Sequence, residues 1–146
     1  MGKIIKRKWG TYEVLKENKE EGYKVKILTV DPKRWLCDQL HRHRDETWYI
    51  LSGSGRFKYN RQSDDTGYHM THVFPGQMIE IFRGDHHSIE NDGCAPLVFV
   101  EVQEGEYLEE DDIVRFDTYP DDWEKAFAER VEKRGGSTIV DEYYEF

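Results

Sequence analysis

The stretch QLHRHRDETWYILSG, residues 39–53, decides the fold, because two closely spaced histidines precede a run rich in aromatic and aliphatic residues. We expect an extended strand through Leu40 to His43. Alternate side chains of a strand share one face and lie about 6.5 Å apart for each two-residue step. Gln39, His41 and His43 would therefore face the same side. Metal–nitrogen bonds measure only about 2.0–2.1 Å, so the strand must curve around an ion, as strands do inside a β-barrel.

A second stretch, GQMIEIFRGDHHSIEN at residues 76–91, contains His87, which we expect to face the first two histidines from another strand. The fourth ligand stays open between Gln39 and Glu46, whose carboxylate can return to the same interior after a small kink. Imidazole and carboxylate ligands suit zinc, manganese, iron and nickel alike, so the metal's identity stays open too. The spacing predicts a site for one divalent metal ion on three histidines: His41, His43 and His87.

The rest of the chain between Tyr23 and about Val102 has the pattern of an all-β protein. Short runs rich in Val, Ile, Phe, Tyr and Trp alternate with Gly, Pro, Asp and Asn. The preceding segment, residues 8–22, resembles an edge strand and a charged turn. Eight or so short strands require a barrel or a sandwich, and the histidine spacing favours the barrel. The runs expected as strands are 23–30, 40–43, 47–51, 55–60, 68–74, 77–82, 86–91 and 96–103.

The pattern changes after Tyr119. In DDWEKAFAERVEKR, the apolar residues Trp123, Phe127 and Val131 recur every four positions, which predicts an amphipathic C-terminal helix. The tail STIVDEYYEF that follows could add a strand to this barrel or to a neighbouring subunit's barrel.

Length and composition favour a single domain. We expect a barrel domain over residues 1–118, with its core at about 23–104, followed by a helix and tail over 119–146. Hydrophobic residues make up 37% of the 146 residues and charged residues 35%, a mixture typical of a soluble globular protein. A basic start without a following apolar stretch predicts no export signal, hence a cytoplasmic protein.

The net charge and the cysteine content indicate which partners and which thiol state to expect. The formal net charge of −9 disfavours nucleic acid and anionic lipid. Cys37 and Cys94 lack the close pairing of zinc ribbons and redox motifs, so both are expected to be reduced thiols. We also expect a homodimer, because small barrels of this kind have exposed sheet edges. The candidate contact residues are aromatic side chains near the two chain ends: Trp9, Tyr12, Tyr143, Tyr144 and Phe146.

The two histidine stretches resemble the cupin pattern, with HxH followed by Glu and Gly53 in the first and GxxHxxxN in the second. A closer resemblance, from Lys8 to about Asp117, is to type II phosphomannose isomerases. It is carried by KWGTYEVL, YKVKILTVDP, QLHRHRDETWYILSGSG, GDHHSIEN and PLVFVEVQEGEYLEEDDIVRF. The resemblance implies a double-stranded β-helix, the cupin jelly roll. It also implies an aldose–ketose isomerase that interconverts mannose 6-phosphate and fructose 6-phosphate.

Isomerisation through an enediolate requires a metal, a base and cations for the phosphate. Glu46 is the expected base if it does not ligate tightly, and Lys26, Arg44 and Arg115 are the expected phosphate ligands. Two alternatives remain. Histidines and a carboxylate also form non-haem iron sites that activate dioxygen, and a cupin can bind a sugar without converting it. Asp112 and Arg115 are alternatively expected to form a structural ion pair at the barrel end.

Overall fold

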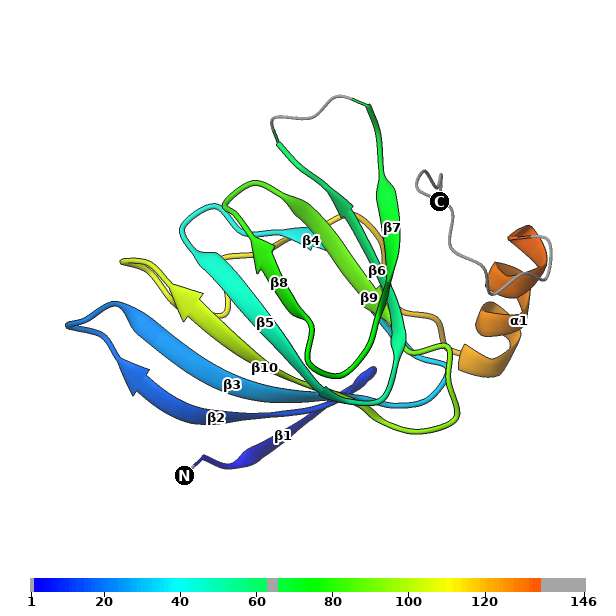
Figure 1. The fold of residues 1–146 in the computed structure, drawn as a ribbon, viewed down its shortest axis with the longest axis horizontal. Helices are drawn as coiled ribbons and strands as arrows, with labels where there is room; N and C mark the ends of the chain where they lie inside the picture. Colours follow the sequence, from blue (N-terminus) through cyan, green and yellow to red (C-terminus); the bar gives the residue numbers. More distant parts are fainter. Residues whose placement is uncertain (1, 63–65, 135–146) are drawn as a thin grey trace.

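The fold was analysed in a computed structural model that describes residues 2–62 and 66–134. Two antiparallel sheets face each other (Figure 1), one of six strands in the order β1-β2-β3-β10-β5-β8 and one of five in the order β11-β4-β9-β6-β7. The strands are β1 (Ile4–Arg7), β2 (Gly10–Asn18), β3 (Tyr23–Val30), β4 (Trp35–Leu40), β5 (Asp45–Ser52), β6 (Gly55–Asn60), β7 (His69–Val73), β8 (Met78–Ile81), β9 (His86–Glu90), β10 (Leu97–Glu104) and β11 (Val114–Arg115).

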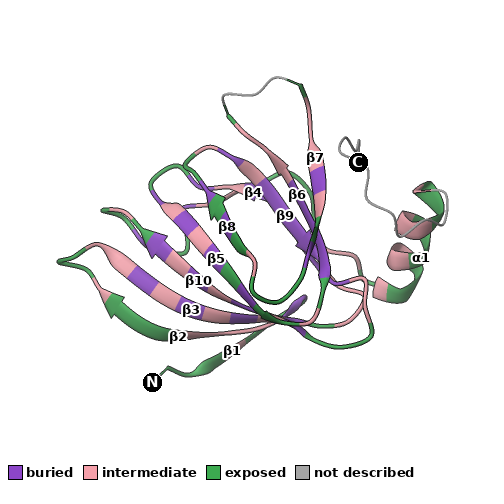
Figure 2. Cartoon of the chain, viewed as in Figure 1, coloured by how far each residue is buried: buried purple, intermediate pink, exposed green. Residues whose placement is uncertain are grey.

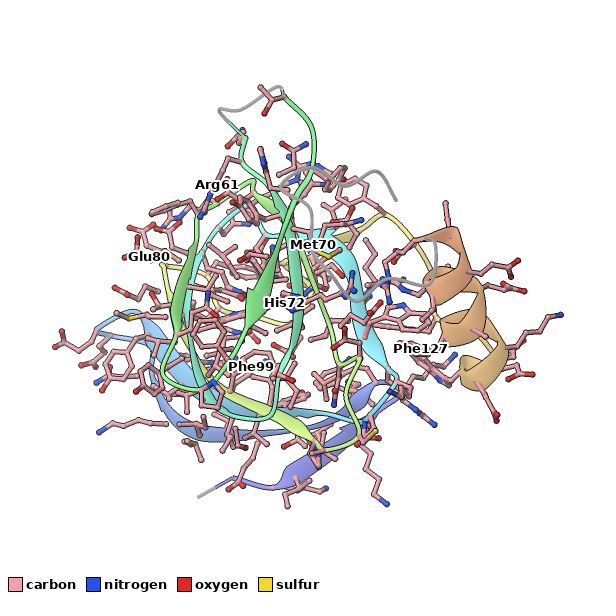
Figure 3. All side chains as sticks on the ribbon, turned by 45° about the vertical axis from the view of Figure 1, so that its right-hand side comes forward. Arg61, Met70, His72, Glu80, Phe99 and Phe127 are labelled. Atoms are coloured by element: carbon pink, nitrogen blue, oxygen red, sulfur yellow. The ribbon has the colours of Figure 1, made fainter. Side chains whose placement is uncertain are left out.

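The core lies between the two sheets. Burial alternates residue by residue along β3 and β10, as expected for strands with one inward face (Figure 2). Figure 3 shows Phe99 in this crowded interior, where its ring stacks on Trp48 with ring centroids 4.5 Å apart. The predicted all-β double-stranded β-helix is confirmed.

One strand prediction is wrong. The strand expected at 40–43 ends at Leu40, and the next four residues form the turn into β5. The β4–β9 register shifts between Leu36 and Gln39, which marks a bulge that redirects the end of β4. The Asp112 carboxylate then holds the turn, because it accepts hydrogen bonds from the backbone N–H of Arg42 and of His43, each at 3.0 Å. Neither cause is visible in local sequence periodicity.

The predicted C-terminal helix is confirmed as α1, Trp123–Lys133. Asp122 caps it by accepting a hydrogen bond from the Lys125 backbone N–H at 3.1 Å. Trp123 packs edge-on against Trp35 on the five-stranded sheet, with centroids 4.7 Å apart. This described helix is neither long nor apolar enough to cross a membrane. The tail that was expected to add a strand lies outside the described residues.

Glu90 of β9 connects the helix to the sheet and yields a prediction about stability. Its carboxylate is 3% exposed and accepts hydrogen bonds from Arg130 Nε at 2.7 Å and Arg134 Nη1 at 2.9 Å. Because removing one partner leaves buried charge uncompensated, Glu90→Gln should lower the free energy of unfolding by about 3 kcal/mol in urea denaturation. The exposed Glu129→Gln should change it by less than about 0.5 kcal/mol. Equal losses in both variants would contradict this role.

Candidate metal centre and pocket

Three residues from three segments converge inside the barrel. One nitrogen or carboxylate oxygen from each of His41, Glu46 and His87 lies within 4.8 Å of those of the other two. The three residues are 3%, 2% and 0% exposed, respectively. His41 follows β4, Glu46 lies on β5 and His87 lies on β9, so both sheets contribute. Such a group of ligand atoms can hold one metal ion.

The hydrogen bonds of the two histidines fix which ring nitrogen faces this cluster. His41 Nδ1 lies 2.6 Å from the Asp112 carbonyl oxygen, and His87 Nδ1 lies 3.0 Å from the Asp85 carbonyl oxygen. A carbonyl only accepts, so each Nδ1 carries the hydrogen and each Nε2 offers a lone pair. His87 Nε2 is buried and has no hydrogen-bond partner among the described residues. This arrangement, with Nδ1–H bound to a carbonyl and Nε2 free to ligate, is the one that metal-binding histidines use.

The electrostatics of the cluster also suit a cation. Burial lowers the pKa of His87 to about 4, so its imidazole is neutral and able to ligate at neutral pH. Burial alone would raise the pKa of Glu46, but His41 and the Arg44 guanidinium outweigh burial and hold that pKa below its ordinary value. Glu46 Oε2 accepts from Arg44 Nε at 2.8 Å, and Oε1 accepts from Trp48 Nε1 at 2.9 Å. The donor set therefore combines neutral imidazoles with an oriented carboxylate.

The structure does not bring His43 into this cluster. Its side chain is 60% exposed, and its Nδ1 lies 3.0 Å from Asp112 Oδ1. Asp112 is therefore engaged by the turn at His43, and the ion pair expected between Asp112 and Arg115 is not formed. Gln39, in contrast, pairs with His87 across β4 and β9 and lines the adjoining pocket with His41.

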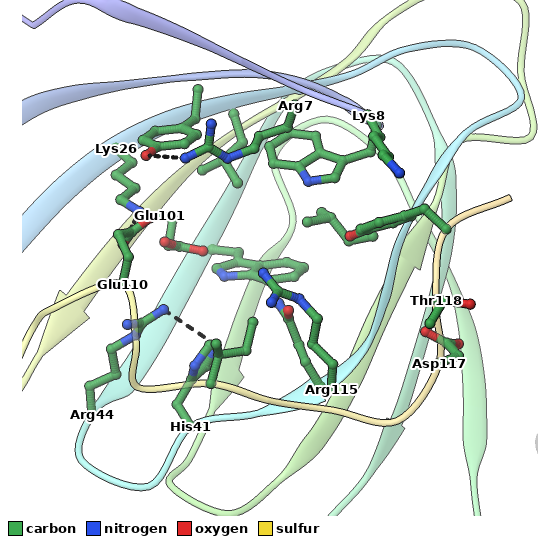
Figure 4. Close-up of a pocket in the computed structure, with 18 residues that line it drawn as sticks. Arg7, Lys8, Lys26, His41, Arg44, Glu101, Glu110, Arg115, Asp117 and Thr118 are labelled. Atoms are coloured by element: carbon green, nitrogen blue, oxygen red, sulfur yellow. Dashed lines mark hydrogen bonds and ion pairs between the residues drawn. The ribbon is translucent and has the colours of Figure 1, made fainter. Parts of the chain in front are cut away.

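A cavity of about 490 Å³ adjoins the cluster (Figure 4). Lys26, Arg44 and Arg115, the three cations expected at the substrate, all line it. Lys26 Nζ is paired with Glu110, at 2.8 and 3.0 Å from its two carboxylate oxygens, and Arg44 is paired with Glu46. Arg115 forms no ion pair within residues 2–62 and 66–134. Aromatic side chains form much of the remaining wall: Trp9, Tyr12, Trp48 and Tyr119.

Glu101 is a pocket residue that sequence reasoning missed. It is 5% exposed, lines the cavity and accepts a hydrogen bond from Gln103 Nε2 at 2.7 Å. Burial and the negative charge of Glu46 raise the pKa of Glu101 to about 8. The available signal was the alternation of β10, which continues the inward positions Leu97 and Phe99 into two polar residues.

Solved structures share this architecture. Capsular polysaccharide assembling protein CapF from Staphylococcus aureus superposes with a TM-score of 0.69 at 18% identity, over 81% of this chain and 35% of CapF in one crystal form. Oxalate decarboxylase from Lactobacillus farciminis superposes with a TM-score of 0.66 at 16% identity, over 79% of this chain and 33% of that protein. At these identities the similarity shows a shared fold.

Sequence comparison adds the family. Mannose-1-phosphate guanylyltransferase ManC of Salmonella typhimurium is 38% identical over 117 residues, which cover 80% of this chain and 22% of ManC. Mannose-1-phosphate guanylyltransferase of Escherichia coli K12 is 36% identical over 112 residues, 77% of this chain and 22% of that protein. The chain thus spans about a fifth of the length of these relatives. A sequence model of one family matches residues 1–118, and the chain belongs to that family, mannose-6-phosphate isomerase C-terminal.

Proposed function

We propose that the protein is a metal-dependent isomerase that interconverts mannose 6-phosphate and fructose 6-phosphate through an enediolate. The observation that carries the proposal is the buried group formed by His41, Glu46 and His87 beside a sugar-sized cavity. Family membership supports the same reaction class. The named relatives are guanylyltransferases several times longer than this chain, so the reaction rests on the site and not on their names.

These ligand atoms fit a divalent ion, because the buried His87 Nε2 has a lone pair and no hydrogen-bond partner among the described residues. His41, Glu46 and His87 would hold the ion. Gln39 is the proposed fourth ligand because it pairs with His87 across β4 and β9 and itself lines the pocket. A bound divalent ion would supply the positive charge that stabilises the two oxygens of an enediolate. We do not include His43, because its ring faces away from the cluster.

Transfer of a proton from C2 to C1 of the sugar needs a carboxylate that reaches the substrate. Both oxygens of Glu46 are hydrogen-bonded, to Trp48 and Arg44, and Glu46 is absent from the residues that line the cavity. Glu101 does line the cavity. We therefore assign Glu46 to metal binding and Glu101 to proton transfer. Ionised Glu101 removes the C2 proton of the open-chain aldose. After this proton exchanges with solvent, the Glu101 carboxyl group delivers a proton to C1 to give the ketose.

Exchange with solvent tests this reaction directly. Metal-loaded protein incubated with mannose 6-phosphate in D₂O should place deuterium at C2 of the aldose and at C1 of the ketose, as read by NMR. Heat-inactivated protein in the same buffer is the control. Conversion without any deuterium would argue against an enediolate that exchanges its proton.

A second candidate follows from the ligand types themselves. Two histidines and one carboxylate with open positions are also the ligands of non-haem iron oxygenases. Oxygen uptake by the iron-loaded protein with a sugar substrate would support that alternative. Tight sugar binding with neither isomerisation nor oxygen uptake would instead indicate a binding protein. The cations and aromatic side chains of the cavity favour a sugar phosphate as the ligand in each case.

Two of the five contact residues predicted for the homodimer lie away from a free surface. Trp9 is only 7% exposed in the core and Tyr12 lines the pocket, whereas the other three candidates lie outside the described residues. The edge strand β8 instead exposes Met78 beside Tyr49 of β5, at 65% and 46%. We propose this edge as the dimer contact. Light scattering at micromolar concentration should give a dimer, and Met78→Glu should give a monomer. A monomeric parent would contradict the proposal.

A further inference from the structure

We propose that the tip of the β1–β2 hairpin binds the phosphate group of the substrate, through Arg7 and Lys8. The inference rests on the proposed function, because it assumes a sugar phosphate as the ligand. It changes the assignment made from sequence, in which Lys26, Arg44 and Arg115 were the phosphate ligands.

The hairpin tip is held firmly against the pocket. Arg7 pairs with Gly10 across a turn formed by Lys8 and Trp9, and Trp9 is buried in the core. The Trp9 carbonyl oxygen accepts a hydrogen bond from the Asp31 backbone N–H at 3.0 Å. Gly10 has a φ of 154°, and a Cβ there would lie 1.9 Å from the Thr29 carbonyl oxygen, so the turn requires glycine. These constraints place the two cations at the pocket with little backbone entropy left to lose on binding.

Charge pairing separates the cations of the pocket into two groups. Lys26 and Arg44 are buried and already paired with carboxylates. Within the part of the chain that the structure describes, no carboxylate lies within ion-pair distance of the other three. These are Arg7, Lys8 and Arg115. Arg7 does donate hydrogen bonds to the Lys6 carbonyl oxygen and the Tyr12 hydroxyl, at 3.1 and 3.3 Å.

The concentration of unpaired positive charge is unusual for this chain, whose formal net charge is −9. Three acids in the described part of the chain also line the cavity. Glu110 is paired with Lys26, Glu101 accepts a hydrogen bond from Gln103, and burial together with the nearby charge of Asp38 raises the pKa of Asp117 above its ordinary value. Cations outnumber acids on the pocket wall, and Arg7 and Lys8 have no carboxylate partner among the described residues, so the pocket favours an anionic ligand. Guanidinium groups in particular match the oxygens of a phosphate monoester.

The position of these cations also fits the length of the ligand. Figure 4 shows Arg7 and Lys8 on the opposite edge of the pocket from His41 and Arg44. In mannose 6-phosphate the phosphate is on C6, at the other end of the chain from C1 and C2, where the proton moves. A phosphate held at the hairpin tip therefore leaves the reacting carbons free to lie at the metal cluster. Because the phosphate group does not change during the reaction, contacts to it hold the substrate and the transition state equally, and they contribute to KM rather than to kcat.

The matched test compares two double variants that remove the same charge from the same hairpin. Arg7→Gln with Lys8→Gln removes the pocket cations, whereas Lys3→Gln with Lys6→Gln removes two exposed lysines that do not line the cavity. The pocket variant should raise KM for mannose 6-phosphate by about 10- to 100-fold with kcat nearly unchanged, because each lost contact is a charge-assisted hydrogen bond. The control variant should change KM by less than about twofold.

Direct titration with inorganic phosphate keeps the test independent of turnover. The parent and the control variant should bind it, and the pocket variant should bind it at least about 10-fold more weakly. Phosphate binding that is unchanged in the pocket variant, or absent from the parent, would overturn the anion site. Phosphate binding in the parent without any isomerisation would instead overturn the proposed reaction and leave the anion site standing.

Discussion

His87→Ala should abolish uptake of a divalent ion, whereas His43→Ala should still bind about one ion per chain, the stoichiometry expected of a single three-ligand site. The reason is geometric. His87 is fully buried, and its Nε2 has no hydrogen-bond partner in the described part of the chain. The His43 side chain is 60% exposed, with its Nδ1 against Asp112. His41→Ala should behave as His87→Ala does. Elemental analysis after incubation with zinc, manganese, iron or nickel measures the difference.

His69→Ala provides the matched control for a histidine outside the cluster. Its metal content should equal that of the parent. Equal losses in the His43 and His87 variants would mean that the turn after β4 adopts another conformation around the ion. An absence of any uptake by the parent would remove the metal-centred account as a whole.

Glu101→Gln should lower isomerase turnover by roughly two to four powers of ten while metal content stays at the parental level, because a general acid–base group contributes about that much. The amide keeps the shape of the side chain and its position beside Gln103 but cannot take the proton from C2. Glu46→Gln should act differently. It removes a charged ligand, so metal affinity should fall first, and excess metal should restore much of the activity.

Titration of each variant with metal separates the two roles. Glu104→Gln, an exposed change on the same strand, should leave both metal affinity and turnover unchanged. The assignment would be reversed if Glu46→Gln kept its metal and lost turnover while Glu101→Gln stayed active. That result would restore Glu46 as the base, as the sequence alone had suggested.

The local pattern of apolar residues and turn residues predicted much of the fold. The strands at 23–30 and 55–60 have the predicted bounds, because burial alternates along the first and turn residues border the second. β1 and β11 were not predicted, since four and two residues carry too little periodicity and both strands depend on distant partners. Arg7 at the pocket therefore could not be found from sequence, because its place depends on β1.

The direction of a site residue could be predicted from sequence only where that residue lies within a strand. His87 lies on β9, and its inward direction follows from alternation. His41 and His43 were expected to share a face, but the strand ends at Leu40 and Asp112, some seventy positions further along the chain, holds the turn. Long-range contacts of this kind leave no trace in local spacing.

The most direct test of the metal-dependent isomerase is a coupled assay on mannose 6-phosphate with metal-stripped and metal-restored protein. Stripped protein should be inactive, and adding back one equivalent of a suitable divalent ion should restore conversion to fructose 6-phosphate. His87→Ala should stay inactive at any metal concentration. Full activity in the stripped protein, or no conversion with any divalent ion, would contradict the account.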